Sequence, residues 1–209
     1  MPESPTAAPD LNLWLGRAGL QNFDGADQFI RLAEAVRTLH DTVAAARPTA
    51  RASAEAAEQL EALANALGQF AVDESDQVAA RLLSSPGRGQ TLLPPFHLDS
   101  WHENSVRGRI RFSRHYLGSN GAAHGGAVSL FFDDLLGQLA NVPGSPRART
   151  AYIRVDYRQI TPLDRDLSVV VDVSRRDGRK ITIVGELRDG PTVLAVAEGL
   201  FVTLRDGQP

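Results

Sequence analysis

Cysteine is absent from the 209-residue sequence. Without it the chain has no disulfide framework, no zinc site held by thiolates and no cysteine nucleophile. The five histidines are scattered, at positions 40, 97, 102, 115 and 124, and their spacing does not suggest a metal cluster. We therefore expect no metal site.

Long apolar runs are absent as well. There is no stretch of about 18 apolar residues that could span a bilayer, and the N-terminus has neither the basic start nor the apolar core of a secretory signal. With 43% hydrophobic residues the chain can nevertheless bury a core, so disorder is not expected. We expect a cytoplasmic protein without membrane insertion.

The sequence also has little excess of charge of one sign, with a net charge of −3. Residues 1–85 carry 6 basic and 12 acidic side chains, a net charge of −6, whereas residues 86–209 carry 16 and 13, a net charge of +3. Because a nucleic-acid footprint needs a dense stripe of Lys and Arg, neither part is expected to bind nucleic acid. An anionic small molecule fits the C-terminal part better.

Two amphipathic patterns occupy the N-terminal part of the chain. Apolar residues at spacings of three and four predict helices over 27–46 and 52–70, which would form an antiparallel hairpin. Such a hairpin cannot bury both of its apolar stripes by itself. One alternative is an extension that packs on the main domain or serves as a dimerisation arm. The other is a separate partner-binding module.

Residues 86–95, rich in Pro and Gly, are expected to link this N-terminal extension (1–85) to a domain over 96–209. Within that domain, residues 124–141 are apolar on nearly every side, which predicts a buried helix. Alternating apolar and polar residues predict strands at 106–112, 149–159, 166–175, 179–188 and 192–204. We predict an α+β fold in which an antiparallel meander wraps one long central helix.

The sharpest chemical pattern is His124-Gly125-Gly126 before the central helix, followed by two adjacent acids, Asp133 and Asp134. The glycines allow a ligand to approach the backbone, and the first N–H groups of a helix can hold an anion or a polarised carbonyl oxygen. A carboxylate among so many aliphatic residues is costly unless it is compensated, so at least one acid should line a polar cavity. The same residues could also be a helix-entry histidine and salt-bridged acids without any catalytic role.

His124 and Asp133 lie nine residues apart, about two and a half helical turns. At 100° per residue the two positions point in roughly opposite directions, so they could hardly share one site within one chain. If both are catalytic, the simplest solution is a two-fold dimer in which the glycine turn of one subunit faces the carboxylate of the other.

The segment HGGAVSLFFD at 124–133 resembles the signature of hotdog-fold acyl-CoA thioesterases of the phenylacetate-pathway (PaaI-like) class and of the human thioesterase superfamily members. Three further segments occur in the order that the family has them: TAYIRVDYRQITPL at 150–163, DGRKITIVGEL at 177–187 and AEGLFVTL at 197–204. The resemblance covers roughly residues 95–205 and leaves the helical extension unexplained. It implies a hotdog fold, an antiparallel sheet wrapped around a long helix.

The resemblance also implies roles for individual residues. Asp133 matches the catalytic carboxylate, which acts as general base on water or as nucleophile. Gly125 matches the residue whose backbone N–H binds the thioester oxygen, and His124 matches the histidine that shapes that turn. Thr150 matches a hydroxyl that holds the water or the carboxylate. Asp134, which lies 100° further round the helix, is expected to be structural.

Substrate contacts are expected around this centre. Asn120 lies near a position where many relatives carry a polar residue, although the matching position itself is Gly118. Gly126 belongs to the same glycine turn. Arg179 and Lys180, beside the Asp177-Gly178 turn, are candidates for the phosphates of coenzyme A, although a solvated turn would look the same. The acyl pocket is expected to be apolar, drawn from strand residues and from Phe131, Phe132 and Leu135.

Hydrolysis of acyl-CoA thioesters to free acid and CoA is therefore the expected activity, with no cofactor because coenzyme A is part of the substrate. The alternative is a non-catalytic acyl-CoA sensor or scaffold in which the acidic helical hairpin recruits a partner. A hotdog dehydratase or hydratase is disfavoured, because it would need a histidine on the central helix. An isolated sheet of this kind leaves its edges open, so we expect a homodimer or homotetramer.

Overall fold

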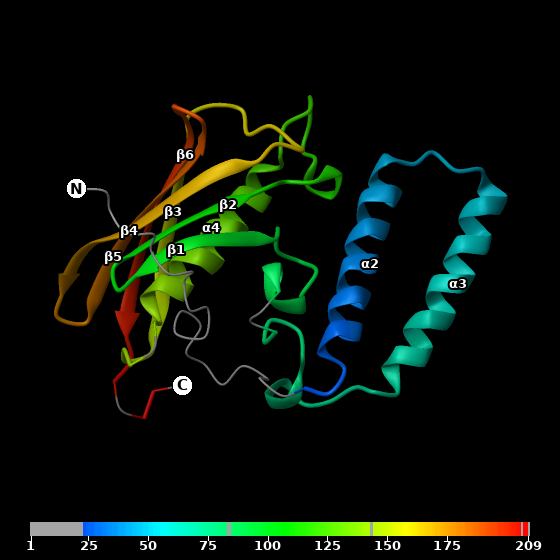
Figure 1. The fold of residues 1–209 in the computed structure, drawn as a ribbon, viewed down its shortest axis with the longest axis horizontal. Coiled ribbons are helices and arrows are strands. Elements are labelled where there is room, and N and C mark those ends of the chain that lie inside the picture. Colours follow the sequence, from blue (N-terminus) through cyan, green and yellow to red (C-terminus); the bar gives the residue numbers. More distant parts are fainter. Residues whose placement is uncertain (1–22, 83–84, 143, 206, 209) are drawn as a thin grey trace, which may run out of the picture.

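The computed structural model describes residues 23–82, 85–142, 144–205 and 207–208. Two N-terminal helices, α2 (Ala26–Ala45) and α3 (Ala50–Gly68), precede a sheet that wraps around a third long helix, α4 (Gly125–Ala140). Figure 1 shows the sheet and α4 forming one body, with the pair of N-terminal helices standing to one side of it. Short 3-10 helices lie in the connecting segments: η1 (Glu74–Asp76), η2 (Pro86–Gly89) and η3 (Arg114–Tyr116).

The two N-terminal helices agree with the predicted spans of 27–46 and 52–70 to within two residues at each end. The turn between them follows from local chemistry, because a helix cannot continue through Arg47-Pro48. Thr49 then caps α3, its hydroxyl accepting the N–H of Ala52 at 3.2 Å. Residues 1–22 of the predicted extension lie outside the described residues, and the division of the chain at 86–95 stays a prediction.

In the described part of the chain, six strands form one antiparallel sheet in the order β1-β2-β4-β5-β6-β3. The strands are β1 (Phe96–His102), β2 (Ser105–Ile110), β3 (Ala148–Tyr157), β4 (Leu167–Asp177), β5 (Lys180–Asp189) and β6 (Thr192–Thr203). The predicted meander is limited to β4, β5 and β6. Instead of pairing with β4, the next strand along the chain, β3 pairs with β6 and forms one edge of the sheet.

The edge strand β1 has no counterpart among the predicted strands. Its register against β2 shifts between Leu98 and Ser100, which marks a bulge. Because a bulge inserts one extra residue, the apolar Phe96 and Leu98 fall out of step with Trp101. The period of two that reveals other strands in this sequence is therefore broken in the middle of β1.

Helix α4 supplies the centre of the core. Phe132, Leu136 and Leu139 have no exposed surface, and Val128, Phe131 and Leu135 have at most 2%. Fully burying one such side chain stabilises a fold by roughly 1.5–3 kcal/mol. The strands face α4 with every second residue, among them Ile183, Leu187 and Phe201, all fully buried. The apolar run at 124–141 thus forms the buried helix that its composition predicts.

Helix α2 is attached to the body through η3. The carboxylate of Asp41 accepts the backbone N–H of His115 at 2.7 Å, and the rings of His40 and His115 stack with their centres 4.5 Å apart. Nearer the start of the helix, Ala33 is buried. Helix α2 therefore packs on the main body, which is one of the roles considered for the hairpin.

Helix α3 differs, because none of its residues is buried within the described chain. Its apolar stripe remains 39–47% exposed at Leu60, Leu63 and Leu67. A role as dimerisation arm or partner-binding module therefore stays open for this helix alone. No helix in the described residues is both long and apolar enough to cross a membrane.

Candidate active site

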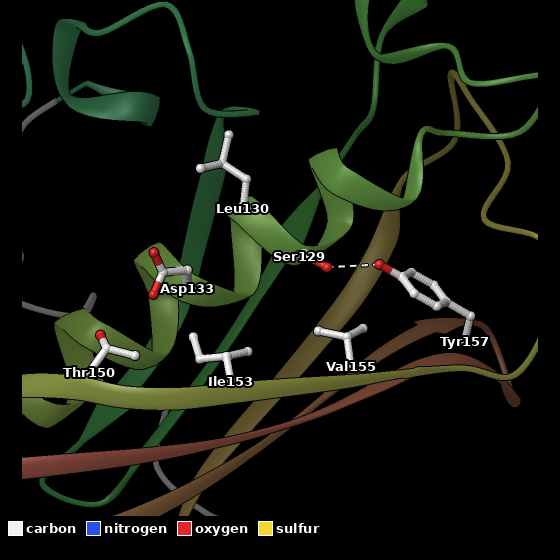
Figure 2. A pocket seen from close by; sticks show the side chains of 7 residues that line it. All are labelled: Ser129, Leu130, Asp133, Thr150, Ile153, Val155 and Tyr157. Atoms are coloured by element: carbon white, nitrogen blue, oxygen red, sulfur yellow. Dashed lines mark hydrogen bonds between the residues drawn. The ribbon is translucent and has the colours of Figure 1, made fainter.

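An open pocket of about 440 Å³ lies between α4 and the edge strand β3. The helix contributes Ser129, Leu130 and Asp133, and the strand contributes Thr150, Ile153, Val155 and Tyr157. Figure 2 shows the strand side chains pointing toward the helix. Ser129 and Asp133 are one helical turn apart and so share a face of α4, while Ile153, Val155 and Tyr157 alternate along one face of β3.

The pocket has two polar ends with an aliphatic stretch between them. Asp133 and Thr150 lie at one end, and the hydroxyls of Ser129 and Tyr157 lie 2.7 Å apart at the other (Figure 2). The carboxylate of Asp133 has no hydrogen-bond or ion-pair partner in the described residues and is exposed to solvent. It is therefore free to accept a proton or to attack a carbonyl carbon.

Asp134, next to it, is placed quite differently. Arg88 of η2 donates to both of its carboxylate oxygens, at 2.7 and 3.2 Å, and the side-chain amide of Gln138 donates to it at 2.5 Å. These three hydrogen bonds compensate a carboxylate that is only 29% exposed. Of the two adjacent acids, Asp134 anchors the segment before β1 to the central helix, and Asp133 faces the pocket.

The start of α4 is held by its own histidine. His124 is the N-cap residue, and its Nδ1 accepts the backbone N–H of Gly126 at 2.9 Å. A nitrogen that accepts carries no proton, so the neutral ring has its proton on Nε2. The N–H of Gly126 is therefore committed to the cap. The N–H of Gly125 has no partner among the described residues and can receive a ligand oxygen.

Tyr157 belongs to this site, although the sequence reasoning missed it. Its hydroxyl donates to the carbonyl oxygen of Gly125 at 2.7 Å and also contacts Ser129. A local signal was present, because the alternation of β3 puts position 157 on the same face as Ile153 and Val155. The contact with Gly125 could not be read from the sequence, because 32 residues separate the two.

Three predicted substrate contacts lie outside the pocket of a single chain. Asn120 sits in an exposed turn with a positive φ of 51°. Arg179 lies in the turn between β4 and β5, where its side chain donates to the carbonyl of Thr203 at 2.9 Å, and Lys180 begins β5. The geometry within one chain therefore does not bring them to Asp133.

Three residues expected to line an acyl pocket do not line this one. Phe131, Phe132 and Leu135 are buried in the core and none of them lines the pocket. The reason is the helical period: these positions point into the sheet, whereas Ser129, Leu130 and Asp133 line the pocket. The apolar surface of the pocket comes from Leu130 and from the strand.

A sheet wrapped around one central helix is the hotdog fold, and in this chain a carboxylate and a glycine turn lie beside the edge strand. The crystal structure of a thioesterase superfamily protein resembles this chain with a TM-score of 0.70. The two are 29% identical, and the match covers 83% of this chain and 94% of that one. The resemblance to hotdog-fold thioesterases, and with it the predicted fold, is confirmed.

Other solved structures match about half of the chain. A conserved protein from Pseudomonas aeruginosa is 21% identical, covering 52% of this chain and 88% of its own, with a TM-score of 0.47. A protein from Streptococcus mutans, bound to acetyl CoA, is 16% identical, with coverages of 52% and 88% and a TM-score of 0.49. These weaker likenesses add nothing to the assignment of function. No family model and no curated protein matches the chain.

Proposed function

We propose that this protein hydrolyses acyl-CoA thioesters to free acid and CoA, as a homo-oligomer that is at least a dimer. The observation that carries the proposal is the carboxylate of Asp133, which has no partner among the described residues and lies in an open pocket that also holds Thr150 and aliphatic side chains. A binding protein would need the apolar surface and the glycine turn but no free carboxylate. The likeness to a thioesterase superfamily protein over most of the chain supports the same reaction class.

The two-ended pocket supports a site shared between subunits. Strand β3 is an edge strand whose outer side pairs with no other strand among the described residues, and an edge of this kind readily pairs with a second copy. In a two-fold dimer the two β3 strands would run antiparallel. The end carrying Asp133 and Thr150 would then lie beside the partner's end carrying the glycine turn. Each of the two active sites would then combine the Asp133 end of one subunit's pocket with the glycine-turn end of the other's.

In such a site the chemistry needs few groups, because a thiolate is a good leaving group. The N–H of Gly125, next to the N–H of Gly126 that the His124 cap holds, binds the thioester oxygen where negative charge develops. Asp133 takes a proton from water as the water oxygen attacks the carbonyl carbon, or attacks that carbon itself to form an anhydride that water then cleaves. Thr150 positions the water or the carboxylate. The C–S bond breaks. The CoA sulfur receives the proton that Asp133 took from the attacking water or, in the anhydride route, leaves as thiolate and takes a proton from solvent.

The remaining predicted contacts concern the CoA portion of the substrate. Arg179 and Lys180 carry positive charge at one end of the sheet and are proposed to contact its phosphates. Asn120 and Gly126, which flank His124, are proposed to contact the substrate beside the thioester. Because Gly126 donates its N–H to His124, its contribution is close backbone approach and not a hydrogen bond.

The proposal is tested by following thiol release from short aliphatic, aromatic and long-chain acyl-CoAs. The chain has no cysteine, so a thiol reagent reports released CoA without background from the protein. We expect turnover with at least one acyl class. Binding of acyl-CoAs by calorimetry without release from any of them would overturn hydrolysis. That outcome would favour the sensor, with the exposed stripe of α3 as the next surface to study.

A further inference from the structure

The first peptide of α4 is held at both ends. In the peptide group that joins Gly125 to Gly126, the carbonyl oxygen of Gly125 accepts a hydrogen bond from the hydroxyl of Tyr157 at 2.7 Å. The N–H of Gly126 donates to Nδ1 of His124 at 2.9 Å. One bond comes from the helix cap and the other from a strand 32 residues further along the chain. Peptide groups at the start of a helix normally have their N–H groups unsatisfied, so a clamp on this peptide fixes the first turn.

A third hydroxyl extends the clamp into the pocket. A phenol has one proton, and the carbonyl of Gly125 can only accept, so Tyr157 gives its proton to that carbonyl. The 2.7 Å contact with Ser129 must then be donated by the serine hydroxyl to the tyrosine oxygen. Each donor in such a chain polarises the next, which strengthens the bond to the carbonyl.

The two glycines of the motif are explained by the same contacts. A Cβ added to Gly125 would lie 3.2 Å from the hydroxyl oxygen of Tyr157, and one added to Gly126 would lie 3.0 Å from Nδ1 of His124. Either is tighter than an ordinary contact. The motif therefore makes room for the tyrosine and the histidine to grip the backbone, in addition to any room that it leaves for a ligand.

We infer that Tyr157 is a positioning residue, which acts through the Gly125–Gly126 peptide. It orients the N–H of Gly125, which has no partner in the described part of the chain, toward the reacting carbonyl oxygen. The inference rests on the proposed function for the identity of that oxygen, but the clamp itself does not. Ser129 supports Tyr157 and acts through it. An N–H that already points at the position where charge develops lowers the activation barrier more than one that must reorient, because reorientation itself costs free energy.

The test compares Tyr157→Phe with Tyr152→Phe. Tyr152 lies on the same strand as Tyr157 and is similarly exposed, but its hydroxyl donates to Glu198. Neither Tyr152 nor Glu198 lines the pocket. We expect Tyr157→Phe to lower kcat by roughly 10- to 100-fold with KM changed by less than about twofold. Tyr152→Phe should leave both constants unchanged. Equal kinetics in the two variants, with an active wild type, would overturn the inference.

Two further readouts separate positioning from a general structural effect. Ser129→Ala should lower kcat by a few-fold alone and have no further effect in the Tyr157→Phe background, because it acts through the tyrosine. In the ligand-free protein, Tyr157→Phe should shift the 13C resonance of the Gly125 carbonyl and the amide of Gly126, and Tyr152→Phe should not. If the wild type releases no thiol, the proposed function fails, and unshifted resonances would then overturn the clamp separately.

Discussion

The guanidinium of Arg88 donates two hydrogen bonds, of 2.7 and 3.2 Å, to the carboxylate of Asp134, which lies 46 residues further along the sequence. Arg88 has a positive φ of 54° between Gly87 and Gly89, which are also left-handed. Few residues other than glycine tolerate that backbone region, so the ion pair holds an arginine where the backbone disfavours it. The contact ties the segment before β1 to the helix that carries Asp133.

Replacing Arg88 by alanine should therefore destabilise the fold. Asp134, whose side chain is 29% exposed in the wild type, loses its cation, and we expect a loss of about 2 kcal/mol in the free energy of unfolding. Urea unfolding measures it. Arg109→Ala is the matched control, because its ion pair with Asp99 is exposed and should change stability by less than about 1 kcal/mol. Equal losses in the two variants would contradict the anchoring role.

The sequence predicts different surroundings for Asp133 and Asp134, but it does not reveal the partner of Asp134. The helical period alone separates positions 133 and 134 by 100°, enough to expect different surroundings. The partner that makes Asp134 structural comes from a turn 46 residues earlier, which no local pattern predicts. Period and composition likewise predict α4, β4, β5 and β6. They cannot give the pairing of β3 with β6, because the choice of partner depends on contacts distant in sequence.

The hydroxyl of Thr150 gives a second prediction. Thr150→Val keeps the shape and the strand preference of the side chain but removes the group that would hold the water or Asp133. We expect kcat to fall by roughly tenfold with little change in stability. Thr182→Val, between the buried Ile181 and Ile183 and hence on the opposite face of the sheet, should have no effect. An unchanged rate in Thr150→Val would remove this residue from the mechanism.

Sharing of the site between subunits can be tested by mixing inactive variants. Asp133→Asn lacks the carboxylate, and Gly125→Val forces its side chain against Tyr157 and disturbs the oxyanion N–H. In a two-fold dimer, a randomly mixed population should recover about a quarter of the wild-type activity, since half of the dimers are mixed and each has one intact site. Differently tagged chains that co-purify without any recovered activity would place both groups within one subunit.

The junction of α2 with the body should respond to alkaline pH. Burial raises the pKa of Tyr116 from 10.0 to about 12. The neutral phenol is the form that the fold favours, so this group leaves stability unchanged below about pH 10 and lowers it as the pH rises from about 10 to about 12. Urea unfolding should show a smaller alkaline loss of stability in Tyr116→Phe than in the wild type. Identical pH dependence would contradict a buried, neutral Tyr116.

The central claim is that Asp133, and not its neighbour, drives thioester hydrolysis. The most direct measurement compares kcat for Asp133→Asn and Asp134→Asn on the best acyl-CoA substrate, with circular dichroism confirming that both variants are folded. We predict a fall of at least about 100-fold for Asp133→Asn and a change of less than about fivefold for Asp134→Asn. Retention of wild-type kcat by folded Asp133→Asn would contradict the account.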